Sequence, residues 1–259
     1  MTPSSYSITF CVGAPRSGTT LVGSLLSEGP RAFPMLPECT FITQLIRQYH
    51  DIINYSDKPR FDAFAKSNTE LASAFNPAIR GMIDIALSHF PGVNAQELIL
   101  KDPELTLYID CLPAFFDKFK LVCVIRDPRD VVASFARVSE KKGVTMDFES
   151  LIGLVFNYYY RASISDLAKA NHIHFLSFEK ISNGNEDEFR ALESFLGYRV
   201  GRSGFGKMLF EIDKSDATFS DNYGKPKKSL TKTMPALSQE EISTIENAFA
   251  GYNATYGWW

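Results

Sequence analysis

Residues 13–20, with the sequence GAPRSGTT, decide the fold of this chain. They follow a short apolar run at residues 8–12 and precede residues 21–26, whose apolar side chains recur at helical spacing. Backbone N–H groups gather at the N-terminus of a helix, where the helix dipole is positive, so a strand, loop and helix in this order predict an anion-binding loop. The alternative is a simple glycine-containing turn in which Thr19 and Thr20 cap the helix.

The loop departs from a Walker A sequence at one decisive position. Gly13 and Gly18 have the Walker spacing G-x-x-x-x-G, but Thr19, followed by Thr20, stands where the lysine belongs. That lysine contacts the outer phosphates of a nucleoside triphosphate held with Mg²⁺, so its absence argues against NTP hydrolysis and ordinary phosphoryl transfer. Arg16 supplies a cation within the loop instead, and its guanidinium suits forked hydrogen bonds to a terminal oxyanion.

Three further apolar runs predict buried strands at residues 98–100, 121–125 and 173–178. Helical patterns lie between them, including a long amphipathic stretch over residues 151–167. Strands that alternate with helices need crossover connections, which favours a parallel sheet covered on both faces. We therefore expect an α/β, three-layer, P-loop-like fold with a central parallel sheet flanked by helices. No repeat, low-complexity tract or linker divides the chain, so we expect one domain over residues 1–259.

Composition excludes several classes of protein. The 27 Lys and Arg residues against 30 Asp and Glu residues give a net charge of −3, which argues against a general nucleic-acid binder. Four irregularly spaced cysteines and four histidines without ligand spacing predict neither a disulfide framework nor a metal site. The N-terminus lacks a secretory signal pattern, and no apolar run approaches the roughly 18 residues of a membrane span. We therefore expect a cytoplasmic protein.

A second anion signal follows the third predicted strand, at residues 126–130 with the sequence RDPRD. Asp127 suits the N-cap and Pro128 the first position of the helix that comes next. Ligands of open α/β sheets bind at the carboxyl ends of the strands, so Arg126 is expected on the same rim as the loop at residues 13–20. Ser134 lies two turns into the helix and is placed to face that rim. Taken alone, arginines in such a segment are more typical of capping or ion pairing.

The two elements together resemble the nucleotide-binding motifs of the sulfotransferase family, which uses 3′-phosphoadenosine 5′-phosphosulfate (PAPS). Both motifs match without gaps and in the order of the family. The resemblance implies that the 5′-phosphosulfate end is held by the loop residues Arg16, Ser17, Gly18, Thr19 and Thr20. It also implies that Arg126 and Ser134 hold the 3′-phosphate.

Two further segments resemble the branch of this family that contains protein-tyrosine and some bacterial sulfotransferases. Glu38, after Pro37, falls where that branch has a catalytic glutamate, and Lys101 begins a Lys-Asp-Pro sequence that the branch also carries. The histidine base of the soluble aryl and steroid enzymes, expected at the end of the strand that carries Lys101, is missing, and so is their R-K-G motif. The alternative for Glu38 is a carboxylate in the first turn of the next helix, where it would favour the helix dipole.

Two stretches show little periodicity, residues 54–68 and residues 215–235. Within the second, the sequence at residues 220–226 resembles, more weakly, a serine-to-Lys-Pro loop of the tyrosyl branch. The resemblance implies that Lys225 binds the cofactor as part of a lid. The alternative is that the lysines of this segment form a solvated surface run.

The resemblance implies a metal-free, in-line transfer of a sulfuryl group from PAPS to an acceptor hydroxyl, with adenosine 3′,5′-bisphosphate as product. Arg16 and Lys101 would offset charge on the leaving oxygen, and Glu38 would act as general base. Two other functions stay open: a divergent P-loop kinase of a small hydroxyl compound, and a nucleotide-binding module without catalysis. We expect a small-molecule, sugar or lipid acceptor, with a peptide tyrosine as the alternative. Phe41 and Tyr49 would line its pocket if they lie beside Glu38.

Overall fold

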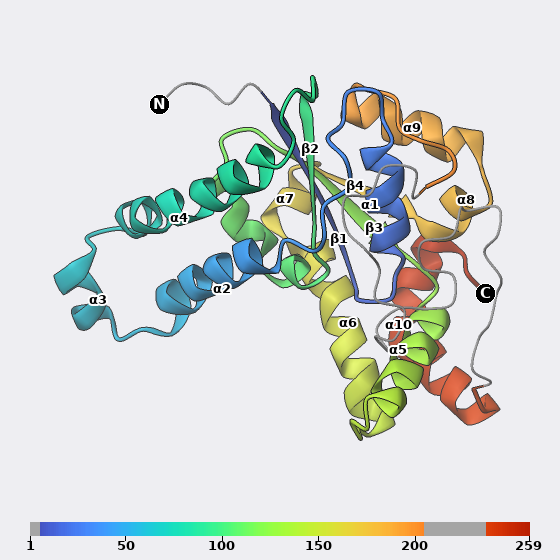
Figure 1. The fold of residues 1–259 in the computed structure, drawn as a ribbon. Coiled ribbons are helices and arrows are strands. Elements are labelled where there is room, and N and C mark those ends of the chain that lie inside the picture. The colour runs from blue at the N-terminus through green and yellow to red at the C-terminus, as the bar shows by residue number, and fades with distance from the viewer. Residues whose placement is uncertain (1–5, 205–236) are drawn as a thin grey trace.

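The computed structural model describes residues 6–204 and 237–259, and within them four strands form one parallel sheet (Figure 1). The sheet order is β2-β1-β3-β4, and every neighbouring pair is parallel. The strands are β1 Ser7–Gly13, β2 Glu97–Lys101, β3 Lys120–Ile125 and β4 Ile173–Ser177. All four predicted strands are confirmed. The fourth ends one residue early because the Ser177 hydroxyl caps the next helix by accepting from the Lys180 amide.

Helices connect the strands and cover the sheet. Their bounds are α1 Thr19–Ser27, α2 Thr40–Tyr55, α3 Lys58–Phe64, α4 Asn68–Ser88, the 3₁₀ helix η1 Glu104–Ala114, α5 Pro128–Lys141, α6 Phe148–Ile164, α7 Asp166–Lys169, α8 Phe178–Ser182, α9 Glu186–Leu196 and α10 Gln239–Tyr256. The helix expected over residues 151–167 ends at Ile164, because the Ser165 side chain starts α7. The expectation of irregular chain at residues 54–68 is wrong in part, since Asp57 caps α3 there and Pro59 suits its first turn.

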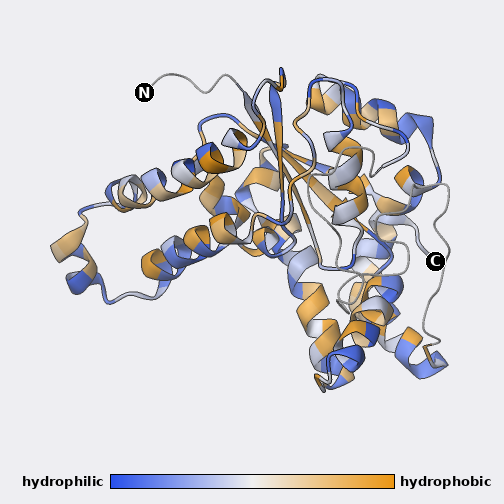
Figure 2. Cartoon of the chain, in the orientation of Figure 1, coloured by the Kyte–Doolittle hydropathy of each residue, from blue (hydrophilic) through white to orange (hydrophobic). Residues whose placement is uncertain are grey.

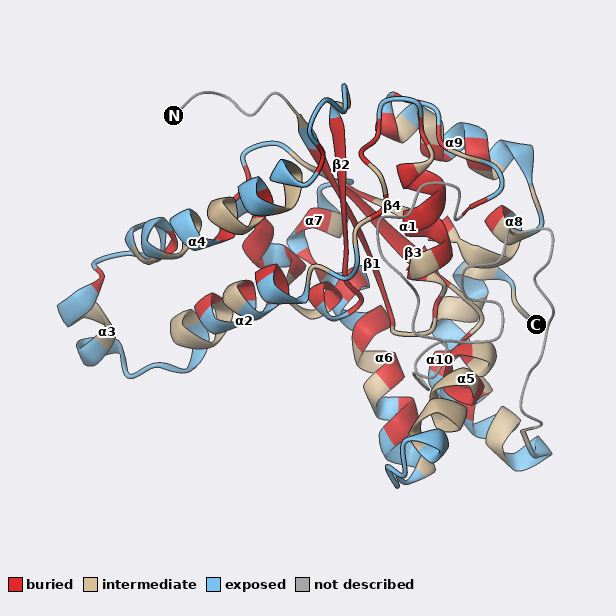
Figure 3. Ribbon diagram, viewed as in Figure 1, coloured by how far each residue is buried: buried red, intermediate tan, exposed pale blue. Residues whose placement is uncertain are grey.

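The core forms two layers, one on each face of the sheet. Alternate residues of β1 point to opposite faces, so Phe10 packs in one layer and Cys11 in the other. The Phe10 layer is covered by α2, α4, η1, α5, α6 and α10, and the Cys11 layer by α1, α8 and α9. Figure 3 shows the strands and the sheet-facing sides of these helices as buried. The structure thus confirms the α/β fold with a central parallel sheet between helices.

Helices α2, α3 and α4 form an arm that extends from the sheet (Figure 1). Tyr49 of α2 is buried where this arm joins the core, and its ring packs edge-on against Phe75 and Phe115. It therefore stabilises the arm and does not line an open pocket, contrary to expectation. Phe41 of the same helix is half-exposed. The helices carry mixed apolar and polar faces in Figure 2, and none within the described part of the chain has the length and apolar character to cross a membrane.

Candidate active site

The loop at residues 13–20 joins β1 to α1, and two of its residues with positive φ follow the strand. Arg16 has a φ of 74° and Gly18, the N-cap of α1, a φ of 101°. The hydroxyl oxygen of Thr106 in η1 supports the start of the loop by accepting from the Gly13 amide at 2.8 Å. Among the described residues no side chain caps α1, and Thr19 is the first residue of the helix itself, so the alternative of a threonine cap is wrong. The first-turn amides of α1 therefore have no side-chain cap and are available to an anion.

Two buried polar atoms at this loop and at the neighbouring strand end have no partner within the described residues. They are the hydroxyl of Ser17, a fully buried residue, and the Nε of Arg126. An unpaired buried donor is costly, and native proteins satisfy nearly all such groups. A sulfate or phosphate group bound beside either donor would accept its hydrogen bond.

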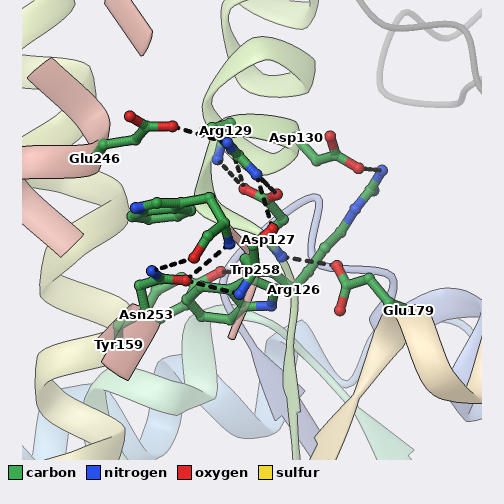
Figure 4. A network of polar contacts seen from close by, with 10 residues as sticks. Arg126, Asp127, Arg129, Asp130, Tyr159, Glu179, Glu246, Asn253 and Trp258 are labelled. Atoms are coloured by element: carbon green, nitrogen blue, oxygen red, sulfur yellow. Dashed lines mark hydrogen bonds and ion pairs between the residues drawn. The ribbon is translucent and has the colours of Figure 1, made fainter. Parts of the chain in front are cut away.

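The two predicted anion motifs are in direct contact. Arg126 follows the last residue of β3, and its Nη1 donates to the carbonyl of Arg16 at 3.0 Å. Arg16 in turn donates from Nε to the Ser134 hydroxyl at 3.1 Å. Arg126 Nη2 also pairs with Asp130 at 2.9 Å (Figure 4). The structure therefore places Arg16, Arg126 and Ser134 together at the carboxyl ends of β1 and β3, as expected for one shared ligand rim.

Lys101, the last residue of β2, brings the third predicted segment to the same rim. Its Nζ lies 2.6 Å from Glu38 Oε1 and 3.3 Å from the Thr20 hydroxyl. The side chain of Lys101 is only 4% exposed, whereas that of Glu38 is 49% exposed, so a buried cation meets a solvent-facing carboxylate. Glu38 precedes the N-cap of α2, Cys39, and therefore lies outside the first turn, which removes the alternative role as a dipole-favouring carboxylate within the helix.

Asp102 connects the segment containing Glu38 to the end of β2. It is buried and accepts from the Thr43 hydroxyl at 2.7 Å and from the Glu104 amide at 3.0 Å. The amide of Cys39 donates to the carbonyl of Lys101 at 3.0 Å. Burial raises the pKa of the Asp102 carboxyl, which the hydrogen bond from Thr43 partly offsets. Cys39, next to Glu38, and Thr43 in α2 are thus both bound to the end of β2, and this keeps Glu38 beside Lys101.

Comparison with known proteins identifies the family to which this chain belongs. A family model described as "Sulfotransferase family" matches residues 9–201. The chain belongs to the sulfotransferase family. This sulfotransferase is 23% identical over 251 residues to a protein of Caenorhabditis briggsae named "Putative protein-tyrosine sulfotransferase", a match that covers 92% of this chain and 84% of the relative. Membership of the family supports sulfuryl transfer as the general reaction class.

Solved structures support the same fold at low sequence identity. The sulfotransferase domain of the Synechococcus PCC 7002 olefin synthase superposes with a TM-score of 0.52 at 17% identity, covering 96% of this chain and 98% of that domain. A sulfotransferase from Alicyclobacillus acidocaldarius has a TM-score of 0.53 at 14% identity, covering 95% of this chain and 92% of the other. At such identities the likeness shows the fold of this sulfotransferase and not its substrate.

Phe178 is a residue of this sulfotransferase rim that the sequence patterns did not single out. Its ring lies under the guanidinium of Arg126, 4.6 Å from Cζ to the ring centroid, and also contacts Gly18. It follows β4, so the rule that ligands gather at the carboxyl ends of the strands was the available signal. The ring thus lies against both the loop, at Gly18, and the guanidinium of Arg126.

The contact with Phe178 leaves no space for a side chain at Gly18. A Cβ atom at Gly18 would lie 2.2 Å from two ring carbons of Phe178, and the φ of 101° is already unfavourable for any residue with a side chain. We expect Gly18→Ala to lower the free energy of unfolding by about 2 kcal/mol or more, measured by urea denaturation. Gly153→Ala is the matched control: Gly153 lies in α6 with nothing within 4 Å of the added atom, so this change should stabilise by about 0.5–1 kcal/mol. If the two substitutions changed the free energy of unfolding equally, the proposed clash with the Phe178 ring would be contradicted.

The predicted cofactor ligand Lys225, together with the suggested lid at residues 215–235, lies outside the described residues. Within the described residues, no three His, Cys, Asp or Glu side chains are grouped as metal ligands would be. The candidate site of this sulfotransferase therefore consists of loop 13–20, Arg126 and Ser134, and the Glu38–Lys101 pair.

Proposed function

We propose that this chain is a PAPS-dependent O-sulfotransferase that transfers the sulfuryl group to an acceptor hydroxyl by in-line displacement. The observation that carries the proposal is the direct contact between the two anion motifs, from Arg126 Nη1 to the Arg16 carbonyl and from Arg16 Nε to Ser134. A ligand with anionic groups at both ends of an adenosine would need two such sites on one rim. A nucleoside triphosphate would instead need the lysine that Thr19 replaces.

The residues present fit both ends of PAPS. The orphaned Ser17 hydroxyl and the first-turn amides of α1 would hold the 5′-phosphosulfate, together with the other loop residues, Arg16, Gly18, Thr19 and Thr20. The orphaned Nε of Arg126 and the hydroxyl of Ser134 would hold the 3′-phosphate. When bound, PAPS supplies the sulfuryl group and becomes adenosine 3′,5′-bisphosphate.

The Glu38–Lys101 pair would perform the proton transfer and stabilise charge. Glu38, half-exposed on the outer side of the pair, would accept the proton of the acceptor hydroxyl as the new O–S bond forms. Lys101 Nζ, which also reaches Thr20 at the start of α1, would stabilise the negative charge left on the departing oxygen as the old S–O bond breaks. Arg16 would add positive charge at the same place.

Isothermal calorimetry with three nucleotides tests the nucleotide specificity. We expect adenosine 3′,5′-bisphosphate to bind at least about tenfold more tightly than adenosine 5′-phosphate, because only the former engages Arg126 and Ser134 in charge-assisted hydrogen bonds. ATP with Mg²⁺ should bind more weakly than the bisphosphate. A preference for ATP with Mg²⁺ would instead support the kinase alternative.

The acceptor is proposed as a small-molecule, sugar or lipid hydroxyl, approached from the exposed side of Glu38 beside the half-exposed Phe41. The name of the Caenorhabditis briggsae relative adds a peptide tyrosine to the acceptors worth testing. A panel of these four classes with a labelled sulfate donor would identify the acceptor. We retain the cytoplasm as the proposed compartment.

A further inference from the structure

Arg129 connects the start of α5 to the segment that follows α10 (Figure 4). Its guanidinium donates from Nε and Nη2 to both carboxylate oxygens of Asp127, at 2.6–3.2 Å. Nη1 donates to Glu246 of α10 at 2.8 Å, and Nη2 also donates to the carbonyl of Trp258 at 3.2 Å. One side chain thus joins the N-cap of α5 to two points near the end of the chain.

The Trp258–Trp259 segment has its own support. The Asn253 side chain accepts from the amides of Trp258 at 2.7 Å and Trp259 at 3.0 Å, and donates to the carbonyl of Trp259 at 2.8 Å. The ring of Trp259 lies against Arg129, with Cζ 4.6 Å from the ring centroid. The chain turns sharply at Gly257, with a φ of 65°, so that both tryptophans return toward α5. The two tryptophans that contact Arg129 are therefore themselves fixed by hydrogen bonds to Asn253.

This network reaches Arg126 through its main chain. The hydroxyl of Tyr159, a buried residue, donates to the carbonyl of Arg126, and its ring packs edge-on against Trp258 with centroids 6.3 Å apart. The next residue, Asp127, is held on one side by Arg129 and on the other by Glu179, which accepts from the Asp127 amide at 2.8 Å. The backbone that presents the Arg126 guanidinium is thus bound directly by Tyr159 of α6 and Glu179 of α8, and Trp258 contacts both Tyr159 and Arg129.

We propose that Arg129 and the Trp258–Trp259 segment are positioning elements that set Arg126 for the 3′-phosphate, an inference that rests on the proposed function. The loop at residues 13–20 contacts Arg126 at the carbonyl of Arg16, but its backbone is also held by Thr106 and its Gly18 packs on Phe178, neither of which touches Arg129. Loosening the anchor should therefore weaken binding at the 3′-phosphate end and leave the 5′ end unaffected.

The test compares the affinities of two probes, adenosine 3′,5′-bisphosphate and adenosine 5′-phosphate, by calorimetry. Arg129→Lys keeps the charge but loses the forked contacts, and Trp259→Leu removes only the ring from a partly exposed position. We expect each variant to bind the bisphosphate about five- to tenfold more weakly, with the 5′-phosphate unchanged within about twofold. The KM for PAPS should rise similarly and kcat should stay within about twofold.

Arg202→Lys is the matched control, because Arg202 also pairs with a carboxylate, Glu193 at 2.8 Å, and lies over an aromatic ring, that of Phe189 at 4.0 Å. It should leave both affinities unchanged. An equal loss for both probes, or an unchanged bisphosphate affinity in folded variants, would overturn the positioning role. If the unmodified protein itself does not prefer the bisphosphate, the proposed function fails first. If Arg129→Lys does not fold, the two affinities measured for Trp259→Leu decide the question.

Discussion

Replacing Glu38 by glutamine is expected to lower kcat for sulfuryl transfer by about 10²- to 10⁴-fold, the range typical of a lost general base. The amide has nearly the shape of the carboxylate and still accepts a hydrogen bond from Lys101, so the pair geometry of 2.6 Å can persist without a proton acceptor. Because Glu38 lies on the solvent-exposed side of Lys101 and outside the anion loop, the affinity for adenosine 3′,5′-bisphosphate should stay nearly unchanged. Steady-state kinetics with calorimetry on the same preparation measures both.

Glu104→Gln provides the control for this result. Both Glu38 and Glu104 lie close enough to Asp102 to raise the pKa of its carboxyl. Replacing either one by glutamine therefore removes one negative charge from the same neighbourhood. Glu104 is exposed, and its side chain has no part in the proposed chemistry. Its replacement should change kcat by less than about twofold. A Glu38→Gln variant with normal turnover would exclude the base role, and equal losses in the two variants would indicate a general effect of charge.

Replacing Lys101 by methionine is expected to lower kcat by about 10²- to 10³-fold, as removal of one group that stabilises the leaving charge does in other enzymes. The stem of Lys101 packs tightly beside α1, since a Cβ atom on Gly23 would lie 3.3 Å from Lys101 Cγ. Methionine keeps this packing better than alanine, so the loss reports on the ammonium group. The effect should appear in kcat, with bisphosphate affinity changed by less than about fivefold. Rapid-quench measurement of a single turnover would place it in the chemical step.

Lys120→Met is the corresponding control. Lys120 is the first residue of β3, at the opposite end of the strands from the rim, where its ammonium lies 5.6 Å from the centroid of the Tyr198 ring. The substitution removes the same charge from the protein but leaves the rim untouched, so kcat should not change. If Lys101→Met lost bisphosphate affinity and kept kcat, Lys101 would be a binding residue and Glu38 would act without its help.

Much of the site could be predicted because its segments are local. The loop at residues 13–20 has its strand and helix immediately on either side, and Asp127 and Pro128 mark the start of α5 by their capping chemistry. The rule that ligands bind at the carboxyl ends of parallel strands then placed Arg126 beside the loop, and the structure has them in contact. Glu38 depended on a family resemblance, because nothing in its own neighbours points to Lys101.

The rest could not be predicted, because it depends on side chains distant in sequence. Phe178 against Gly18, Thr43 bound to Asp102 and Arg129 bound to Trp258 are pairs whose members fall on different elements. Periodicity reports which face of a helix is apolar but not which side chain of another element it meets. In the same way, the helical spacing over residues 151–167 predicts an apolar face but not the hydrogen bond from the Tyr159 hydroxyl to the Arg126 carbonyl.

The amino-acid sequence alone thus determined the order of strands and helices, the anion loop and the absence of a Walker lysine. These features depend on hydrophobic spacing, capping and glycine conformation, which act over a few residues. Only the tertiary structure decided that Lys101 is buried while its partner Glu38 is exposed, that Phe178 lies against Arg126, and that Arg129 joins Asp127 to Trp258. Burial and spacing of this kind arise when a parallel sheet brings the ends of distant strands to one edge.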